Sequence, residues 1–135
     1  MSADPIALVV GPWRDATRDD HLRMEVALAD LLTAGWAPIF YPLALENVLD
    51  DHDPEQRGQA LAASESLVRQ LARAQVAGVA VGLFVVEPGD GLHSEGMRRD
   101  LCAWSSEGAG WIYYLRDEGV ETLRAYRDQA VARAQ

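Results

Sequence analysis

Apolar side chains gather in four short runs that are rich in β-branched and aromatic residues. The runs cover residues 6–11, 37–42, 79–87 and 111–115, and longer mixed stretches separate them. The first run, "IALVVG", and the third, "VAVGLFVVE", hardly alternate between apolar and polar residues. This continuity is typical of strands that are buried on both faces of a parallel sheet. The four runs therefore predict four strands, two of them central.

The stretches between and after these runs carry apolar residues at helical spacing. Such spacing predicts helices over 15–34, 54–77, about 94–107 and about 117 to the end. In the first stretch the repeating residues are Leu22, Val26, Ala29 and Leu32. In the third, Met97, Leu101 and Trp104 form a stripe that can face the sheet, and in the fourth we expect Val120, Leu123 and Tyr126 to point inward. Gly35 is a stop signal for the first helix, and Pro54 suits the first turn of the second.

Strands and helices alternate along the whole chain. This order predicts an α/β fold with a Rossmann-like or flavodoxin-like open parallel sheet of four to five strands and helices on both faces. Because there are no repeats or linkers, we expect residues 1–135 to form a single domain. The least regular segment, 42–58, leaves the carboxyl end of the second strand, where binding loops of such folds lie. Its four acidic residues within 50–55 are typical of a solvated surface more than of a metal cluster.

Composition excludes several classes of function. The 135 residues are 49% hydrophobic and carry 21 acidic against 12 basic side chains, a net charge of −9 that disfavours binding to nucleic acid polymers. No apolar run approaches the ~20 residues that a membrane span needs, and the first residues lack a basic segment before their apolar run. One cysteine and three scattered histidines predict neither disulfides nor a metal site. We expect a cytoplasmic protein without cofactor or membrane partner.

The stretch "LHSEGMRRDL", residues 92–101, follows the third apolar run and a glycine-containing turn. Ser94 is a good N-cap residue, so the sequence predicts that the third helix starts there. The free amides and the positive dipole end of such a helix start attract an anion or a phosphate group. Arg98 or Arg99 can add positive charge, because guanidinium groups pair well with phosphate oxygens.

The spacing of Gly96 and Asp100 adds a candidate reactive group. Residues four apart lie on one helical face, and helix side chains tilt toward the N-terminus, so Asp100 can point past Gly96 toward the same place as Ser94. Roughly 9 Å of helix axis separates Ser94 from Asp100, which suits a ligand with an anionic end and a reactive carbon, such as a nucleotide sugar. A purely structural role for these residues stays open, with Ser94 as a cap and Gly96 as a close-packing position.

Three short motifs together resemble the nucleoside 2-deoxyribosyltransferase-like superfamily. "SEGMRRD" is similar to its S-x-G-x-x-x-E signature, "VVGPWRD" to its N-terminal glycine–proline loop, and "LLTAGWAPIFYP" to its helix–glycine–strand–proline element. Their order agrees with the superfamily over about residues 6–115. The superfamily contains deoxyribosyltransferases, nucleoside 5'-monophosphate N-glycosidases and many small bacterial and phage proteins.

The resemblance implies roles for individual residues. Asp100 would be the nucleophile that attacks the sugar at C1' and expels the base. Ser94 would contact the 5' hydroxyl or phosphate, with Gly96 beside it. The charge of Arg98, and not the resemblance, makes Arg98 a candidate auxiliary clamp on that phosphate. The loop formed by Gly11, Pro12 and Trp13 would embrace the base and the sugar. The resemblance also implies a nucleoside or nucleotide partner and a homodimer or larger homo-oligomer.

Two departures from the superfamily leave a second function open. Aspartate replaces the longer glutamate at position 100, and the aspartate that family enzymes carry before or within the third strand is missing. Glu87 or Asp90, just after that strand, are the candidates to protonate the departing base. The sequence therefore predicts cleavage or transfer of an N-glycosidic bond. The alternative is an inactive nucleotide-binding or oligomeric interaction module of the same fold.

Overall fold

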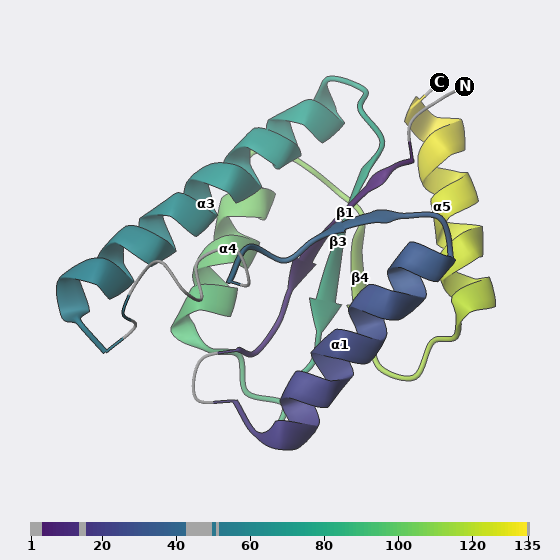
Figure 1. Cartoon of the computed structure of the whole chain (residues 1–135). Helices are drawn as coiled ribbons and strands as arrows, with labels where there is room; N and C mark the ends of the chain where they lie inside the picture. Colours follow the sequence, from purple (N-terminus) through teal and green to yellow (C-terminus); the bar gives the residue numbers. More distant parts are fainter. Residues whose placement is uncertain (1–3, 14–15, 43–49, 51, 135) are drawn as a thin grey trace.

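The computed structural model describes residues 4–13, 16–42, 50 and 52–134. Strands and helices alternate along these residues (Figure 1). The strands are β1 (Ile6–Val10), β2 (Ala37–Ile39), β3 (Val81–Val86) and β4 (Ile112–Leu115). The long helices are α1 (Arg18–Thr33), α3 (Pro54–Val76), α4 (Glu95–Ser106) and α5 (Val120–Ala134).

The four strands form one parallel sheet in the order β2-β1-β3-β4. β1 is central: Leu8 is in register with Ile39 of β2 on one side and with Leu83 of β3 on the other. After β1, the chain adds β2 on one side of it, crosses over to add β3 on the other side, and then adds β4 beyond β3. The direction of building reverses between β1 and β3, and in open α/β sheets ligands bind near such a reversal, beyond the carboxyl ends of the strands.

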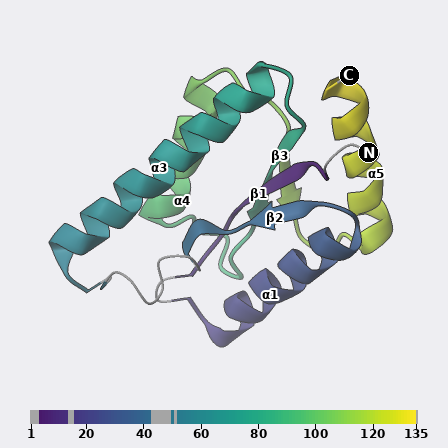
Figure 2. The same ribbon diagram turned by 45° about the horizontal axis from the view of Figure 1, so that its top comes forward.

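Helices cover both faces of the sheet (Figures 1 and 2). On one face, Met24 and Leu31 of α1 and Leu123 of α5 pack on alternate residues of β1 and β3. On the other face, Val68 of α3 and Trp104 of α4 pack on the residues between them. The chain therefore has the predicted α/β architecture, a Rossmann-like open sheet between two helical layers.

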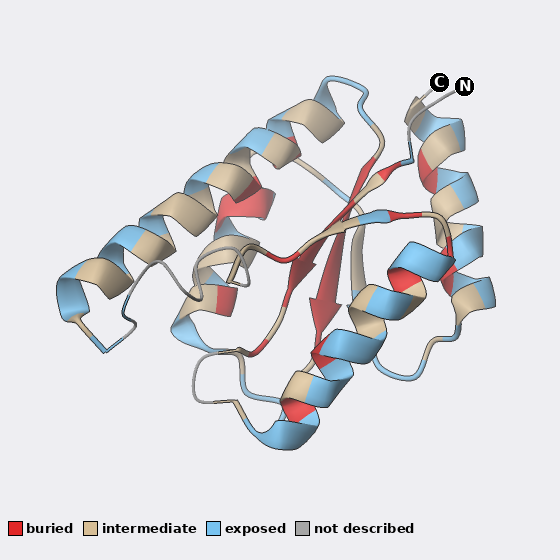
Figure 3. Cartoon of the chain, in the orientation of Figure 1, coloured by how far each residue is buried: buried red, intermediate tan, exposed pale blue. Residues whose placement is uncertain are grey.

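The two central strands are the most buried part of the molecule (Figure 3). Every residue of β3 and four of the five residues of β1 are buried. This confirms the prediction from their uninterrupted apolar runs. β2 ends at Ile39, three residues earlier than predicted, and Phe40 leaves the strand while its ring stays in the core.

Helix starts follow the capping residues in the sequence. Thr17, Asp53 and Ser94 each accept a hydrogen bond from an amide of the first turn, so α1, α3 and α4 begin directly after them. The predicted start of the first helix at Asp15 lies outside the described residues, as does most of the irregular segment 42–58, namely 43–49 and 51.

The structure confirms a helix at α1, but a different face of it packs against the sheet. The repeating apolar residues that were expected to point inward are exposed. Leu22, Val26 and Leu32 are 56%, 51% and 66% exposed. Met24 and Leu31 are fully buried instead. α1 carries apolar residues on two faces, and spacing within one helix does not decide which of them meets the sheet. Among the described residues, no helix has the length and apolar composition that crossing a membrane requires.

Candidate functional site

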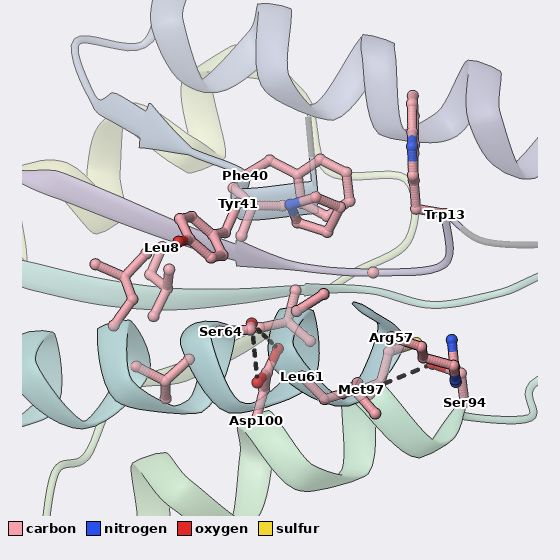
Figure 4. A pocket seen from close by; sticks show the side chains of 18 of the residues that line it. Leu8, Trp13, Phe40, Tyr41, Arg57, Leu61, Ser64, Ser94, Met97 and Asp100 are labelled. Atoms are coloured by element: carbon pink, nitrogen blue, oxygen red, sulfur yellow. Dashed lines mark hydrogen bonds between the residues drawn. The ribbon is translucent and has the colours of Figure 1, made fainter. Parts of the chain in front are cut away.

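A cavity of about 490 Å³ opens at the carboxyl end of β1, on the side of the sheet covered by α3 and α4. Its walls are the end of β1 with the loop that follows, the residues after β2, and the facing sides of the two helices (Figure 4). Ser94, Gly96 and Asp100 of the signature stretch all line this one cavity. The fold thus places a serine, a glycine and a carboxylate from the start of α4 around one space.

Ser94 forms one end of the cavity. Its side-chain oxygen accepts a hydrogen bond of 3.2 Å from the Met97 amide, so it is the N-cap that the sequence predicted. Arg57 of α3 lines the cavity at the same end, beside Ser94 (Figure 4). The Arg57 guanidinium lies 4.0 Å from a Glu95 carboxylate oxygen, which is too far for a hydrogen bond. This end therefore combines a helix N-terminus with an arginine.

Asp100 lies farther along the same wall and is mostly buried. The Ser64 hydroxyl on α3 lies 3.1 Å from Oδ1 and 3.0 Å from Oδ2 of Asp100, so it donates to the carboxylate (Figure 4). Burial raises the pKa of Asp100 to about 6, and the hydrogen bond from Ser64 opposes this rise. Glu65 adds to the rise and Arg99 opposes it. A carboxyl group poised in this way is ionised at neutral pH yet poorly solvated.

Gly96 lets α3 and α4 approach each other. A Cβ added at Gly96 would lie 3.3 Å from Cδ2 of Leu61, which also lines the cavity. The role that the structure shows for this glycine is thus close helix–helix packing. The packing matters for the site, because it brings Ser64 of α3 to Asp100 of α4.

The N-terminal loop contributes an aromatic wall. Trp13 lines the cavity with Phe40 and Tyr41 (Figure 4). The ring centroids of Trp13 and Phe40 lie 5.5 Å apart in an edge-on arrangement, and the Trp13 carbonyl accepts a hydrogen bond of 2.8 Å from Nε2 of His21. Gly11 also lines the cavity, whereas the buried Pro12 does not.

Three candidates from the sequence lie elsewhere. Arg98 is exposed and is not part of the cavity wall. Glu87 and Asp90 line a second groove, on the α1 side of the sheet, instead of the cavity that holds Asp100. There, Oε2 of Glu87 lies 2.9 Å from Nε2 of His93, and Asp90 accepts from the Leu92 amide. The two residues named as candidate proton donors therefore do not line the cavity that holds Asp100.

The sequence analysis missed Arg57 and Ser64. Both lie on the stripe of α3 that Leu61 and Val68 define by steps of three and four, and all four line the cavity. A polar residue inside an apolar helical stripe was the available signal. Asp50, His52 and Tyr41 also line the cavity and were not singled out.

The cavity therefore combines an end formed by a helix N-terminus and an arginine, a partly desolvated carboxylate and an aromatic wall. Within the described residues, no three histidine, cysteine or acidic side chains gather as a metal-ligand set. Comparisons with protein-family models, with curated proteins and with solved structures found no match for this chain.

Proposed function

We propose that this chain binds a nucleoside 5'-monophosphate in the cavity and cleaves its N-glycosidic bond, with Asp100 as the nucleophile. The observation that supports the proposal most is that Ser94 and Asp100 line one cavity while burial raises the pKa of Asp100 to about 6. Perturbed carboxyl groups in concave sites are a common mark of catalytic function. The resemblance to the nucleoside 2-deoxyribosyltransferase-like superfamily points to the same bond.

The phosphate would bind at the Ser94 end. The free amides at the start of α4 and the guanidinium of Arg57 supply donors and positive charge. The base would lie along Trp13, Phe40 and Tyr41, whose rings offer stacking surfaces. This orientation leads the sugar past Asp100, because Asp100 lies beyond Ser94 on the same helix.

The reaction would proceed in two displacements. A carboxylate oxygen of Asp100 attacks C1', and the C1'–N bond breaks with its electron pair passing to the base. The base leaves with a proton, for which Tyr41 and His52 of the cavity wall are the candidate donors. Water then attacks C1' while the Asp100 carboxylate leaves, and the proton that water loses returns to the donor, which gives hydrolysis. Attack by a second base that loses its proton in the same way gives transfer.

The proposal is tested by measuring free base from a panel of ribonucleoside and deoxyribonucleoside 5'-monophosphates and the matching nucleosides. We expect release from at least one monophosphate, and a loss of at least about 10³-fold in Asp100→Asn because the nucleophile is gone. Asp128→Asn removes an exposed carboxylate on α5 and serves as the matched control, with turnover unchanged. Equal turnover in Asp100→Asn and the parent chain would overturn the mechanism.

A nucleotide-binding module without turnover is the second candidate. The observation that favours it is the position of Glu87 and Asp90, which leaves the expected proton donors outside the cavity. Under this alternative, a nucleotide at about 100 times its dissociation constant would stabilise the chain by about 2.7 kcal/mol while no base appears. Thermal melting and base release measured on the same samples separate the two functions.

A further inference from the structure

The inner face of α3 carries a serine where the helix meets α4. Ser64 lies one turn from Leu61 and one turn from Val68, in the stripe that packs against the sheet and α4. Serine and threonine hydroxyls inside helices commonly bond back to a carbonyl of the preceding turn, as Thr33 of α1 does with Ala29. The hydrogen bonds described for Ser64 both go to Asp100 instead.

The geometry of this contact is nearly symmetric. Ser64 Oγ lies 3.1 Å and 3.0 Å from the two oxygens of Asp100, so its one proton is shared between them. A shared proton fixes the plane and the tilt of a carboxylate that would otherwise rotate freely about its last side-chain bond. It engages one lone pair on each oxygen, which leaves about two of the roughly four lone-pair positions of the carboxylate for other partners.

The other charged groups around Asp100 do not replace this hydroxyl. Glu65, next to Ser64 on α3, disfavours the charged carboxylate. Arg99 on α4 favours it, but the Arg99 side chain pairs with Glu65 and with Glu95. The titratable groups on the remaining wall of the cavity are Tyr41, Asp50, His52 and Arg57. Among the described residues, Ser64 is the side chain that donates a hydrogen bond directly to Asp100.

We propose that Ser64 is a positioning residue, which holds the Asp100 carboxylate in one orientation and favours its ionised form. The claim about ionisation stands on the contact itself, whereas the claim about orientation for attack on C1' rests on the proposed function. Because alanine is the better helix former, Ser64→Ala removes the hydroxyl without weakening α3. Ser64→Thr keeps a hydroxyl at the same position.

The ionisation claim is tested without substrate, by following the side-chain carboxyl carbons of aspartate by NMR as pH is varied. The Asp100 signal is assigned by its disappearance in Asp100→Asn. We expect its pKa to rise by about one in Ser64→Ala, because a hydrogen bond to the charged form is lost. Ser64→Thr should titrate like the parent chain. Ser66→Ala is the matched control, since Ser66 is exposed on the same helix and bonds only with Gln70 among the described residues.

An Asp100 titration that is the same in Ser64→Ala and Ser66→Ala would overturn the proposal. So would a Ser64→Thr chain that titrates like Ser64→Ala, because packing and not the hydroxyl would then set the effect. If base release is found, kcat/KM should rise as Asp100 loses its proton. In Ser64→Ala the midpoint of this rise should lie at a pH about one higher than in the parent chain. Nucleotide phosphate titrates in the same range, so the comparison is between variants on one substrate. An NMR shift without turnover would uphold Ser64 and reject the proposed function.

Discussion

At the scale of single residues, the site depends on the Asp100 carboxyl group, whose burial in its charged form lowers the stability of the folded chain. Asp100 is mostly buried, and its pKa rises from 3.8 to about 6 chiefly because burial removes solvent from the charged form. The hydrogen bond from Ser64 and the charge of Arg99 favour the charged form and offset only part of this rise in pKa. Natural sites commonly retain such costs where function requires a reactive group.

Replacing Asp100 should therefore stabilise the chain at neutral pH. A raised pKa means that the folded state holds the proton more tightly, so its stability falls as pH rises from about 4 through about 6. A rise from 3.8 to about 6 corresponds to about 3 kcal/mol at most, and remaining solvent contact lowers this figure. In urea unfolding, Asp100→Asn should exceed the parent chain in free energy of unfolding at pH 8, and the gain should vanish near pH 3.5.

Asp128→Asn provides the control, because an exposed carboxylate on α5 should change stability by less than about 0.5 kcal/mol at either pH. A parent chain that is more stable than Asp100→Asn at pH 8 would mean that Asp100 is a structural partner and not a strained site residue.

At the scale of elements, the start of α4 does two things at once. The Ser94 side chain caps the helix by accepting from the Met97 amide, and the same first turn faces the cavity. A cap contributes about 1 kcal/mol, and a helix N-terminus attracts anions. Substitutions at Ser94 can therefore change the stability of the chain and its binding of an anion independently of each other.

Ser94→Asp should keep the cap but lose the nucleotide, because aspartate caps well while its charge repels phosphate. Ser94→Ala should lose about 1 kcal/mol of stability. Thr17→Ala is the matched control, since it removes the cap of α1 away from the cavity and should cost stability while leaving binding intact. Calorimetric titration with a nucleoside 5'-monophosphate measures binding; tight binding to Ser94→Asp would contradict the assigned phosphate end.

The surroundings of two glycines, Gly11 after β1 and Gly58 in α3, predict opposite effects for the same substitution. A Cβ at Gly11 would overlap Sδ of the buried Met24 and lie 3.2 Å from Cβ of Val86, so Gly11→Ala should destabilise by about 1–3 kcal/mol. Gly58 in α3 has no atom within 4 Å of such a Cβ, and Gly58→Ala should stabilise by about 0.5–1 kcal/mol. Urea unfolding of both variants checks the signs.

The elements also show which parts of the site could be predicted from the sequence. Ser94, Gly96 and Asp100 could be related to one another because helix geometry and capping are local. Arg57 and Ser64 could not be assigned to the site, because only tertiary packing decides which side of α3 meets α4. The position of Glu87 and Asp90 relative to the cavity could not be predicted either, because the loop after β3 makes tertiary contacts with α1, where the Gly89 amide donates to Asp20.

At the scale of the whole molecule, sheet order explains why the cavity lies where it does. The reversal between β1 and β3 puts the carboxyl end of β1 opposite α3 and α4. Alternation of apolar runs and helical stretches was enough to predict the layers, because each layer must bury an apolar face. The largest difference from the sequence prediction concerns α1. Leu22, Val26 and Leu32 were expected to face the sheet, but they are exposed and form an apolar surface.

The homo-oligomer implied by the resemblance stays a prediction at this scale. We expect sedimentation equilibrium to give a mass of at least twice that of one chain. Glutamate in place of both Leu22 and Val26 puts charge on the exposed side of α1, so an oligomer formed through that surface should dissociate. A parent chain that sediments as a monomer across a wide concentration range would contradict the prediction.

The most direct measurement is a crystal structure of the Asp100→Asn variant with a nucleoside 5'-monophosphate that the parent chain binds. The phosphate should accept hydrogen bonds from the first turn of α4 and from Arg57, and C1' should lie about 3–3.5 Å from the side-chain oxygen of residue 100. A nucleotide bound in the groove beside Glu87, or with its phosphate against Asp100 and its sugar in solvent, would contradict the assignment of this cavity.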